Sequence, residues 1–297
     1  MPYAPTDDGF RLYYEEAGAG IPMVFVHEFG GDHRSWEPQM RHFSRWYRCI
    51  TFAARGFPPS DVPADPAHYS QGRAAADIAA ILDGAGVDKA YVVGNSMGGF
   101  AALHFALRMP ERCIGAVVAG CGYGADPAIN PTFRAESALI ADAFENEGSQ
   151  SLSRWYGVGP ARVQFEAKDP RGHAEHVRIL AEHDPVGAAL TMRNVQITRP
   201  MLFEMTEELR RCETPVLIIA GDEDNGVLEA DLMLKRTIPR AGLAILPRTG
   251  HVSNIEEPAL FNHFVERFVL GVSNGTWTPR DPRSISASMT GAGTATE

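Results

Sequence analysis

A glycine-rich stretch at residues 94–99 constrains the fold of this chain more than any other feature. The pentapeptide Gly94-Asn95-Ser96-Met97-Gly98 follows an apolar run and precedes a second apolar run at residues 100–106. A serine at a tight turn from a strand into a helix has a strained backbone, and side chains at the flanking positions would collide with that strand and helix. The free N–H groups at the start of the helix would favour a developing negative charge. We therefore predict that Ser96 is a nucleophile; the alternative is a glycine-rich turn with an incidental serine.

Short apolar runs alternate with helical patterns on both sides of this stretch, which indicates a parallel sheet covered on both faces. The fold class predicted is α/β, with a mostly parallel, doubly wound sheet. Helices are expected at residues 35–45, 74–82 and 256–269. Strands are expected at residues 11–16, 22–27, 48–52, 89–93, 114–119, 215–221 and 243–246.

The alternation stops in the middle of the chain. Residues 125–211 show helix-like segments of mixed polarity and no strand-like run, so we predict a helical lid inserted into one sheet domain, which comprises residues 1–124 and 212–270. After residue 270 the composition turns to Ser, Thr, Gly and Ala, and residues 271–297 are expected to be a disordered tail.

Composition excludes several classes of partner. The net charge of −10 over 297 residues argues against nucleic acid or an anionic membrane as the main partner. The four cysteines are widely spaced, which does not indicate a disulfide framework. The first residues lack the pattern of a signal peptide. No apolar run is long enough to span a bilayer. We expect a cytoplasmic protein that acts on a small molecule without a cofactor or a metal; a homodimer is left open.

A serine nucleophile needs a base, and the base needs an acid that orients it. On a sheet of this kind these residues follow later strands, in the order Ser, Asp or Glu, His. Asp224 lies in a loop after one apolar strand, and His251 follows the last strand, after Gly250. We predict His251 as the base and Asp224 as the acid, with Asp222 and Glu223 as alternatives for the acid.

With these residues and His27-Glu28-Phe29-Gly30-Gly31, the chain resembles the lid-bearing branch of the α/β-hydrolase superfamily over roughly residues 9 to 270. By position, the resemblance implies that the backbone N–H groups of Phe29 and Met97 form the oxyanion hole. It also implies a serine hydrolase acting on a carboxylic ester or lactone.

Two other functions stay open. The residues around Ser96 also resemble those of hydrolases that cleave carbon–carbon bonds in ring-fission products, although Val252 stands where those enzymes usually carry tryptophan. A non-catalytic ligand-binding protein on the same fold is the alternative from another class.

Glu28 departs from the resemblance, because the family usually has glycine there. One interpretation turns Glu28 outward, bonded to loop backbone, Arg34 or Arg55. The other places it at the active site, as in the dienelactone hydrolases, where a glutamate contacts the resting nucleophile. Further candidates are Cys121 as pocket lining, a histidine cluster that we expect to be a solvated helix face rather than a metal site, and bulky lid groups as determinants of specificity. The histidine cluster comprises His173, His176 and His183 with Glu175, and the bulky groups include Trp155 and Phe203.

Overall fold

The computed structural model describes residues 2–285 and residue 290. Eight strands form one sheet in the order β1-β2-β4-β3-β5-β6-β7-β8. β2 pairs antiparallel with β1 and β4, and all the other neighbours pair parallel. The strands are β1 (Tyr3–Pro5), β2 (Arg11–Ala17), β3 (Pro22–Val26), β4 (Arg48–Phe52), β5 (Ala90–Asn95), β6 (Cys113–Ala119), β7 (Val216–Gly221) and β8 (Ala241–Leu246). The predicted mostly parallel sheet is confirmed.

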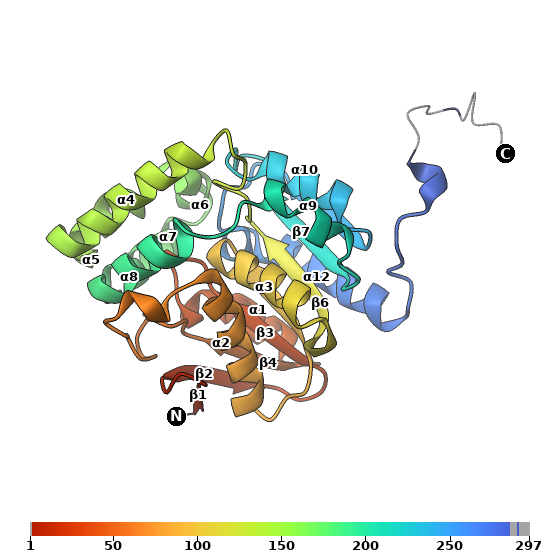
Figure 1. Cartoon of the computed structure of the whole chain (residues 1–297), viewed down its shortest axis with the longest axis horizontal. Coiled ribbons are helices and arrows are strands. Elements are labelled where there is room, and N and C mark those ends of the chain that lie inside the picture. The colour runs from red at the N-terminus through yellow and green to blue at the C-terminus, as the bar shows by residue number, and fades with distance from the viewer. Residues whose placement is uncertain (1, 286–289, 291–297) are drawn as a thin grey trace.

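Helices cover both faces of the sheet, as Figure 1 shows. Side chains alternate between the faces along each strand: Val24 and Val26 of β3 pack into a core with α2, α3 and α10, while Met23 and Phe25 pack into another with α1 and α12. The helices of the sheet domain are α1 (Glu37–Phe43), α2 (Gln71–Gly84), α3 (Met97–Arg108), α10 (Leu228–Thr237), α11 (Ser253–Glu256) and α12 (Pro258–Ser273).

Residues 125–211, here called the insertion, are all described and contain helices but no strand. Most of these helices lie together at one end of the molecule (Figure 1). The last part, α9 with the short 3₁₀ turn before it, packs instead against α10 of the sheet domain. The helices are α4 (Asn130–Glu147), α5 (Ser149–Tyr156), α6 (Val163–Lys168), α7 (Pro170–Ala181), α8 (Pro185–Thr191) and α9 (Thr206–Arg210), with a π-helical turn at Met192–Gln196 after α8.

The C-terminal segment differs from expectation where the structure describes it. Helix α12 continues to Ser273, and the indole N–H of Trp277 donates a 2.9 Å hydrogen bond to the carbonyl oxygen of Arg240. The Trp277 ring packs on the ring of Phe268. Removing the large apolar surface of an indole from water in this way is favourable. Up to Trp277, then, the segment has a defined place on the sheet domain. Beyond it, the N–H of Arg280 donates to the carbonyl oxygen of Pro239 at 3.1 Å. The remaining part of the predicted tail includes residues 286–289 and 291–297, which lie outside the described residues.

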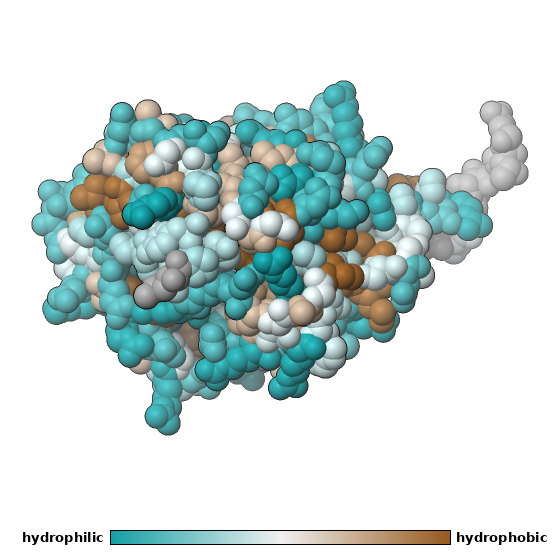
Figure 2. Space-filling view, turned by 90° about the horizontal axis from the view of Figure 1, so that it is seen from below, coloured by the Kyte–Doolittle hydropathy of each residue, from teal (hydrophilic) through white to brown (hydrophobic). Residues whose placement is uncertain are grey.

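The surface of the molecule is mostly hydrophilic where Figure 2 shows it. Hydrophilic residues cover most of the face shown in Figure 2, and apolar residues appear there in small groups. Among the described residues, no helix has both the length and the apolar character that crossing a bilayer requires.

Candidate active site

Ser96 occupies the strained turn expected from its sequence. It lies between β5 and α3 with φ 52° and ψ −115°, in a region that side-chain-bearing residues seldom adopt. Its N–H donates a 2.7 Å hydrogen bond to the carbonyl oxygen of Ala119 on β6. A Cβ on Gly94 would lie 2.1 Å from the carbonyl oxygen of Gly98, and a Cβ on Gly98 would lie 2.0 Å from that of Val26. Both positions therefore require glycine.

The loops after β7 and β8 bring Asp224 and His251 together. Oδ2 of Asp224 accepts a 2.6 Å hydrogen bond from Nδ1 of His251, which leaves Nε2 free to take up a proton. Burial lowers the pKa of His251, but the charge and the hydrogen bond of Asp224 outweigh burial and raise it above its ordinary value. The side-chain amide of Asn95, next to Ser96, donates to the carbonyl oxygen of His251 at 3.3 Å. This bond ties the His251 loop to the turn that carries Ser96.

The two alternative acids point elsewhere. Asp222 is exposed, and its carboxylate accepts a 3.2 Å hydrogen bond from the N–H of Thr249, which holds the loop. The carboxylate of Glu223 is exposed and accepts from the side chain of Gln164 in the insertion, at 2.7 Å. Of the three candidates, only Asp224 contacts His251.

The loop after β3 is fixed by a buried histidine. Nε2 of His27 accepts from the N–H of Ala54 at 2.9 Å, so Nδ1 carries the proton and donates to the carbonyl oxygen of Glu28 at 2.7 Å. The same oxygen accepts from the N–H of Gly31 at 3.3 Å. Phe29 lies within this loop, and its buried ring packs edge-on against the ring of Tyr156 from the insertion. His27 thus has the structural role of holding the backbone around Phe29.

Glu28 does not face solvent. The expectation of an outward side chain bonded to Arg34 or Arg55 is wrong, because Glu28 is 3% exposed and Arg162 of the insertion donates to its Oε2 at 3.3 Å. The expected bond to loop backbone is present, because the N–H of Gly30 donates to the same oxygen at 2.6 Å. Burial would raise the pKa of Glu28, but the Arg162 guanidinium and other neighbours lower it to about 2. Glu28 is therefore a buried anion in the same loop as Phe29.

The arginines named as partners of Glu28 are engaged elsewhere. Arg34 pairs with Asp32 and Glu182, and Arg55 pairs with Asp8 and Asp77. Nor does the structure show contact with the resting nucleophile, since no hydrogen bond joins Ser96 and Glu28 among the described residues.

A neutral histidine completes the surroundings of Arg162. Nε2 of His176 accepts from Nε of Arg162 at 3.2 Å, and burial lowers the pKa of His176 to about 4. The approach of His176 Nε2 to Glu28 Oε1, at 3.4 Å, is therefore not an ion pair at neutral pH. Arg162 also lies over the ring of Tyr156, 4.8 Å from its centroid. The sequence did not predict the role of Arg162, since no motif distinguishes it from the other polar residues of the insertion.

The insertion contacts the loop that carries His251 directly. The N–H of His251 donates a 3.0 Å hydrogen bond to the carbonyl oxygen of Ala161. Lys168 on α6 donates to Glu256 at 2.8 Å and to Glu257 at 2.6 Å, just beyond the His251 loop. The segment from η4 (Pro160–Arg162) to α6 thus forms a wall beside His251.

The remaining candidates show no chemistry of their own. Cys121 is fully buried after β6, and burial raises the pKa of its thiol well above the ordinary value. The expected solvated helix face is wrong for the histidines of the insertion, because His173, His176 and His183 are all buried. They have different partners: His173 bonds to the carbonyl oxygen of Gly157 at 3.0 Å, while His183 packs edge-on against Phe57. Within the part of the chain that is described, no three His, Cys, Asp or Glu side chains gather as metal ligands would.

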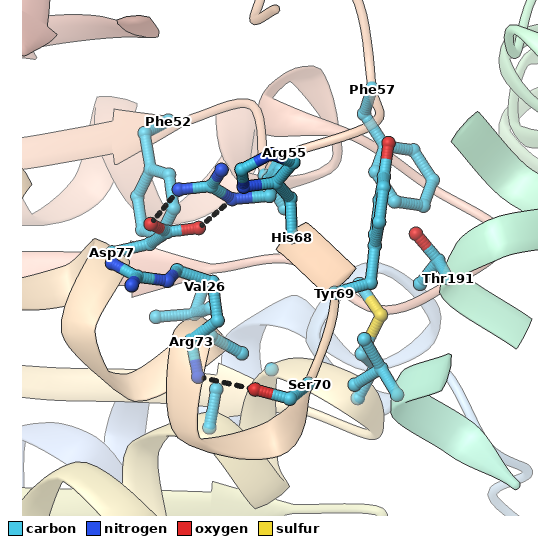
Figure 3. A pocket seen from close by; sticks show the side chains of 16 residues that line it. Val26, Phe52, Arg55, Phe57, His68, Tyr69, Ser70, Arg73, Asp77 and Thr191 are labelled. Atoms are coloured by element: carbon cyan, nitrogen blue, oxygen red, sulfur yellow. Dashed lines mark hydrogen bonds and ion pairs between the residues drawn. The ribbon is translucent and has the colours of Figure 1, made fainter. Parts of the chain in front are cut away.

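Figure 3 shows a small cavity of about 40 Å³ that lies next to the start of α3. It is lined by Met97 and Gly98 at the start of α3 and by Arg55, whose guanidinium is paired with Asp77. A space of this size holds a water molecule or two, and neither Ser96 nor His251 lines it. We therefore do not assign it to a substrate.

Comparison with known proteins gives the family. A family model described as the alpha/beta hydrolase fold matches residues 21–258. The chain is 28% identical over 256 residues to the 3-oxoadipate enol-lactonase 2 of Acinetobacter baylyi, covering 82% of this chain and 86% of that protein. It is 26% identical over 266 residues to the 2-hydroxy-6-oxo-6-phenylhexa-2,4-dienoate hydrolase of Burkholderia cepacia, covering 88% and 91%.

The structure is similar to the crystal structure of the enol-lactonase from Burkholderia xenovorans LB400, with a TM-score of 0.78 and 23% identity, covering 91% of this chain and 100% of that one. A likeness at this identity supports the fold, and the relatives named above are hydrolases. The family model covers most of the chain, so this protein belongs to the α/β-hydrolase fold family.

Proposed function

We propose that this protein is a cofactor-independent serine hydrolase that acts on a carboxylic ester or lactone through Ser96, His251 and Asp224. The observation that carries the proposal is the 2.6 Å hydrogen bond between Asp224 and His251, on loops beside the strained Ser96 turn. The enol-lactonase relative supports the substrate class, because its name describes the opening of a lactone.

The proposed reaction begins when the Ser96 hydroxyl attacks the substrate carbonyl carbon and its proton passes to Nε2 of His251. Asp224 holds the imidazole in the required tautomer and stabilises its positive charge. The N–H groups of Phe29 and Met97 are the proposed donors to the oxyanion, in a loop that His27 holds and at the start of α3.

The tetrahedral intermediate collapses when His251 returns the proton to the departing alkoxide oxygen. This step breaks the ester bond and leaves an acyl group on Ser96. His251 then removes a proton from water, the water attacks the acyl carbon, and Ser96 departs with the proton. The net products are a carboxylic acid and an alcohol, or a hydroxy acid from a lactone.

The insertion is proposed to be a lid that forms part of the substrate chamber. Its support is the set of contacts that Ala161, Arg162 and Tyr156 make with the His251 loop, Glu28 and Phe29.

Two measurements test the proposal. A fluorophosphonate probe should label the wild-type protein at Ser96, and p-nitrophenyl esters should be hydrolysed over many turnovers. Labelling without turnover would favour the ligand-binding alternative. A panel of esters, lactones and dienone acids then decides between ester and carbon–carbon hydrolysis, and preference for the dienone acids would overturn the ester assignment.

A further inference from the structure

Arg199 is a buried cation without a carboxylate partner. Three arginines of the described chain are buried: Arg55, Arg162 and Arg199. Arg55 is paired with Asp8 and Asp77, and Arg162 is paired with Glu28. No carboxylate of the described residues lies within ion-pair distance of Arg199, which is 9% exposed. Burying a charge without a partner costs folding free energy. The unpaired guanidinium of Arg199 is therefore unusual in a protein interior.

Aromatic rings hold the guanidinium of Arg199 in place. It lies 3.7 Å from the ring centroid of Phe100 and 4.6 Å from that of Phe133. Its N–H groups donate to the carbonyl oxygen of Tyr123 and to the side-chain oxygen of Gln196. A guanidinium carries five N–H donors, so the remaining ones have no acceptor among the described residues. A fixed guanidinium with free donors is suited to a planar carboxylate.

The position of Arg199 connects it to the reacting centre. The N–H of Phe100 donates a 3.0 Å hydrogen bond to the carbonyl oxygen of Ser96, so Phe100 lies one turn, about 5.4 Å, along α3. Tyr123 follows β6, whose last residue, Ala119, accepts the N–H of Ser96. Arg199 and the proposed nucleophile thus share two neighbouring elements, α3 and the end of β6.

The charges nearby leave Arg199 as the site for an anion. Glu28 is neutralised by Arg162 and Asp224 is bonded to His251, so neither is free to pair with Arg199. The buried carboxyl group of Asp231 forms no ion pair with Arg199, and burial raises its pKa well above the ordinary value, which favours its neutral form. Burial lowers the pKa of Arg199 to about 10, and the side chain stays cationic at neutral pH.

We propose that Arg199 binds a carboxylate carried by the substrate, so that the preferred substrates are half-esters of dicarboxylic acids or lactones that bear a carboxylate. The inference rests on the proposed serine hydrolase function and specifies its substrate class. The free carboxylate takes the place of the missing partner of Arg199 while the ester carbonyl lies at Ser96.

Matched pairs of esters test this proposal. The monomethyl and dimethyl esters of succinic, adipic and suberic acids differ within each pair only by one free carboxylate, and the three lengths sample the distance from Ser96 to Arg199. The wild type should favour the monoester of at least one length by about ten- to hundredfold in kcat/KM, the range expected of a hydrogen-bonded charge. Arg199→Gln should remove most of that preference, because kcat/KM should fall much more for the monomethyl ester than for the dimethyl ester. Arg199→Lys, which keeps the charge, should retain part of it.

The control variant is Arg193→Gln, an arginine of the insertion that is paired with Asp142 and Glu145 and should leave the preference unchanged. If Arg199→Gln does not fold, inhibition of the wild type replaces it: hexanoate should inhibit dimethyl ester hydrolysis more strongly than hexanamide, which has the same length but no charge. A wild type with no preference for a monoester at any length, or an unchanged preference in folded Arg199→Gln, overturns the role of Arg199. Absence of hydrolysis of every ester would instead contradict the serine hydrolase function.

Discussion

Nη2 of Arg162 in the insertion lies 3.3 Å from Oε2 of Glu28 in the sheet domain, and both side chains are buried. This ion pair joins the wall above the active site to the loop that carries Phe29. Because its two residues lie 134 positions apart, neither local sequence pattern predicts the pair.

The Glu28–Arg162 pair should affect both stability and catalysis. Glu28→Gln keeps the size of the side chain and an acceptor for the N–H of Gly30, but leaves Arg162 unpaired. Breaking a buried pair in this way costs about 3–5 kcal/mol. The negative charge of Glu28 also helps to raise the pKa of His251, so its loss should move the pH midpoint of kcat/KM downward. Urea unfolding and a pH–rate profile measure the two effects.

The double variant Glu28→Gln with Arg162→Gln is the control for that experiment, since it leaves no unpaired charge and should recover part of the lost stability. Equal stability of Glu28→Gln and wild type would show that the pair contributes nothing.

Acid should weaken the same pair. The pKa of Glu28 is about 2 in the folded protein and about 4.3 in an unfolded chain. A group whose folded pKa is depressed stabilises the fold above its unfolded pKa and loses that contribution as the pH falls through the folded value. The free energy of unfolding should therefore fall more steeply between about pH 4.3 and pH 2 in wild type than in Glu28→Gln. Parallel curves over this window would contradict the assignment.

Replacement of the proposed nucleophile should abolish turnover. Ser96→Ala removes the attacking oxygen, so hydrolysis of p-nitrophenyl esters should fall by several orders of magnitude. The fold should be kept, so the circular dichroism spectrum should stay the same. Ser151→Ala, at a partly exposed serine of α5 that bonds to Glu147, is the matched control. A Ser96→Ala variant that keeps a tenth or more of the activity would require another nucleophile.

The pH dependence should follow His251. Free His251 must be neutral to accept a proton, and the Asp224 carboxylate raises its pKa above the ordinary value. The kcat/KM should therefore rise with pH, with a midpoint above about 6.5. Asp224→Asn should lower both the rate and the midpoint, because the charge that favours the imidazolium is gone. Asp222→Asn, at the exposed loop carboxylate, should leave both nearly unchanged, and the reverse ranking would make Asp222 the orienting acid.

Substrate preference should respond to the buried aromatic residues of the insertion. The sequence analysis named Trp155 as a determinant of specificity, but this residue is 46% exposed. The ring of Phe144 is buried, and its centroid lies 5.8 Å from that of Phe29. Phe144→Leu makes room beside the proposed oxyanion loop and should shift the ranking of p-nitrophenyl esters toward longer acyl chains, with Trp155→Ala as the control. If both variants keep the wild-type ranking, Phe144 does not form the acyl wall.

The sequence predicted the parts of the molecule that depend on short-range patterns. The Ser96 turn follows from steric limits at Gly94 and Gly98, and the strands follow from their apolar runs. The first strand, β1, was missed, because its three residues form no period-two pattern and gain their place by pairing with β2.

Short-range sequence patterns could not predict which residues contact each other across long separations in the chain. The partner of Glu28 and the free donors of Arg199 depend on how the insertion folds back on the sheet, which no periodicity encodes. The place of Trp277 on the sheet domain depends likewise on contacts with α12. The segment after residue 270 is rich in small polar residues, and this composition led to the prediction of a disordered tail.

The hydrogen bond from the N–H of His251 to the carbonyl oxygen of Ala161 joins two main chains. Its acceptor is present whatever side chain stands at position 161, so the sequence of the insertion can diverge without losing this link. Among relatives on this fold, substrate range can therefore evolve by side-chain replacement within a retained backbone path. An engineer who grafts another insertion onto this sheet domain must reproduce the course of the chain at this position, and residue identity there is secondary.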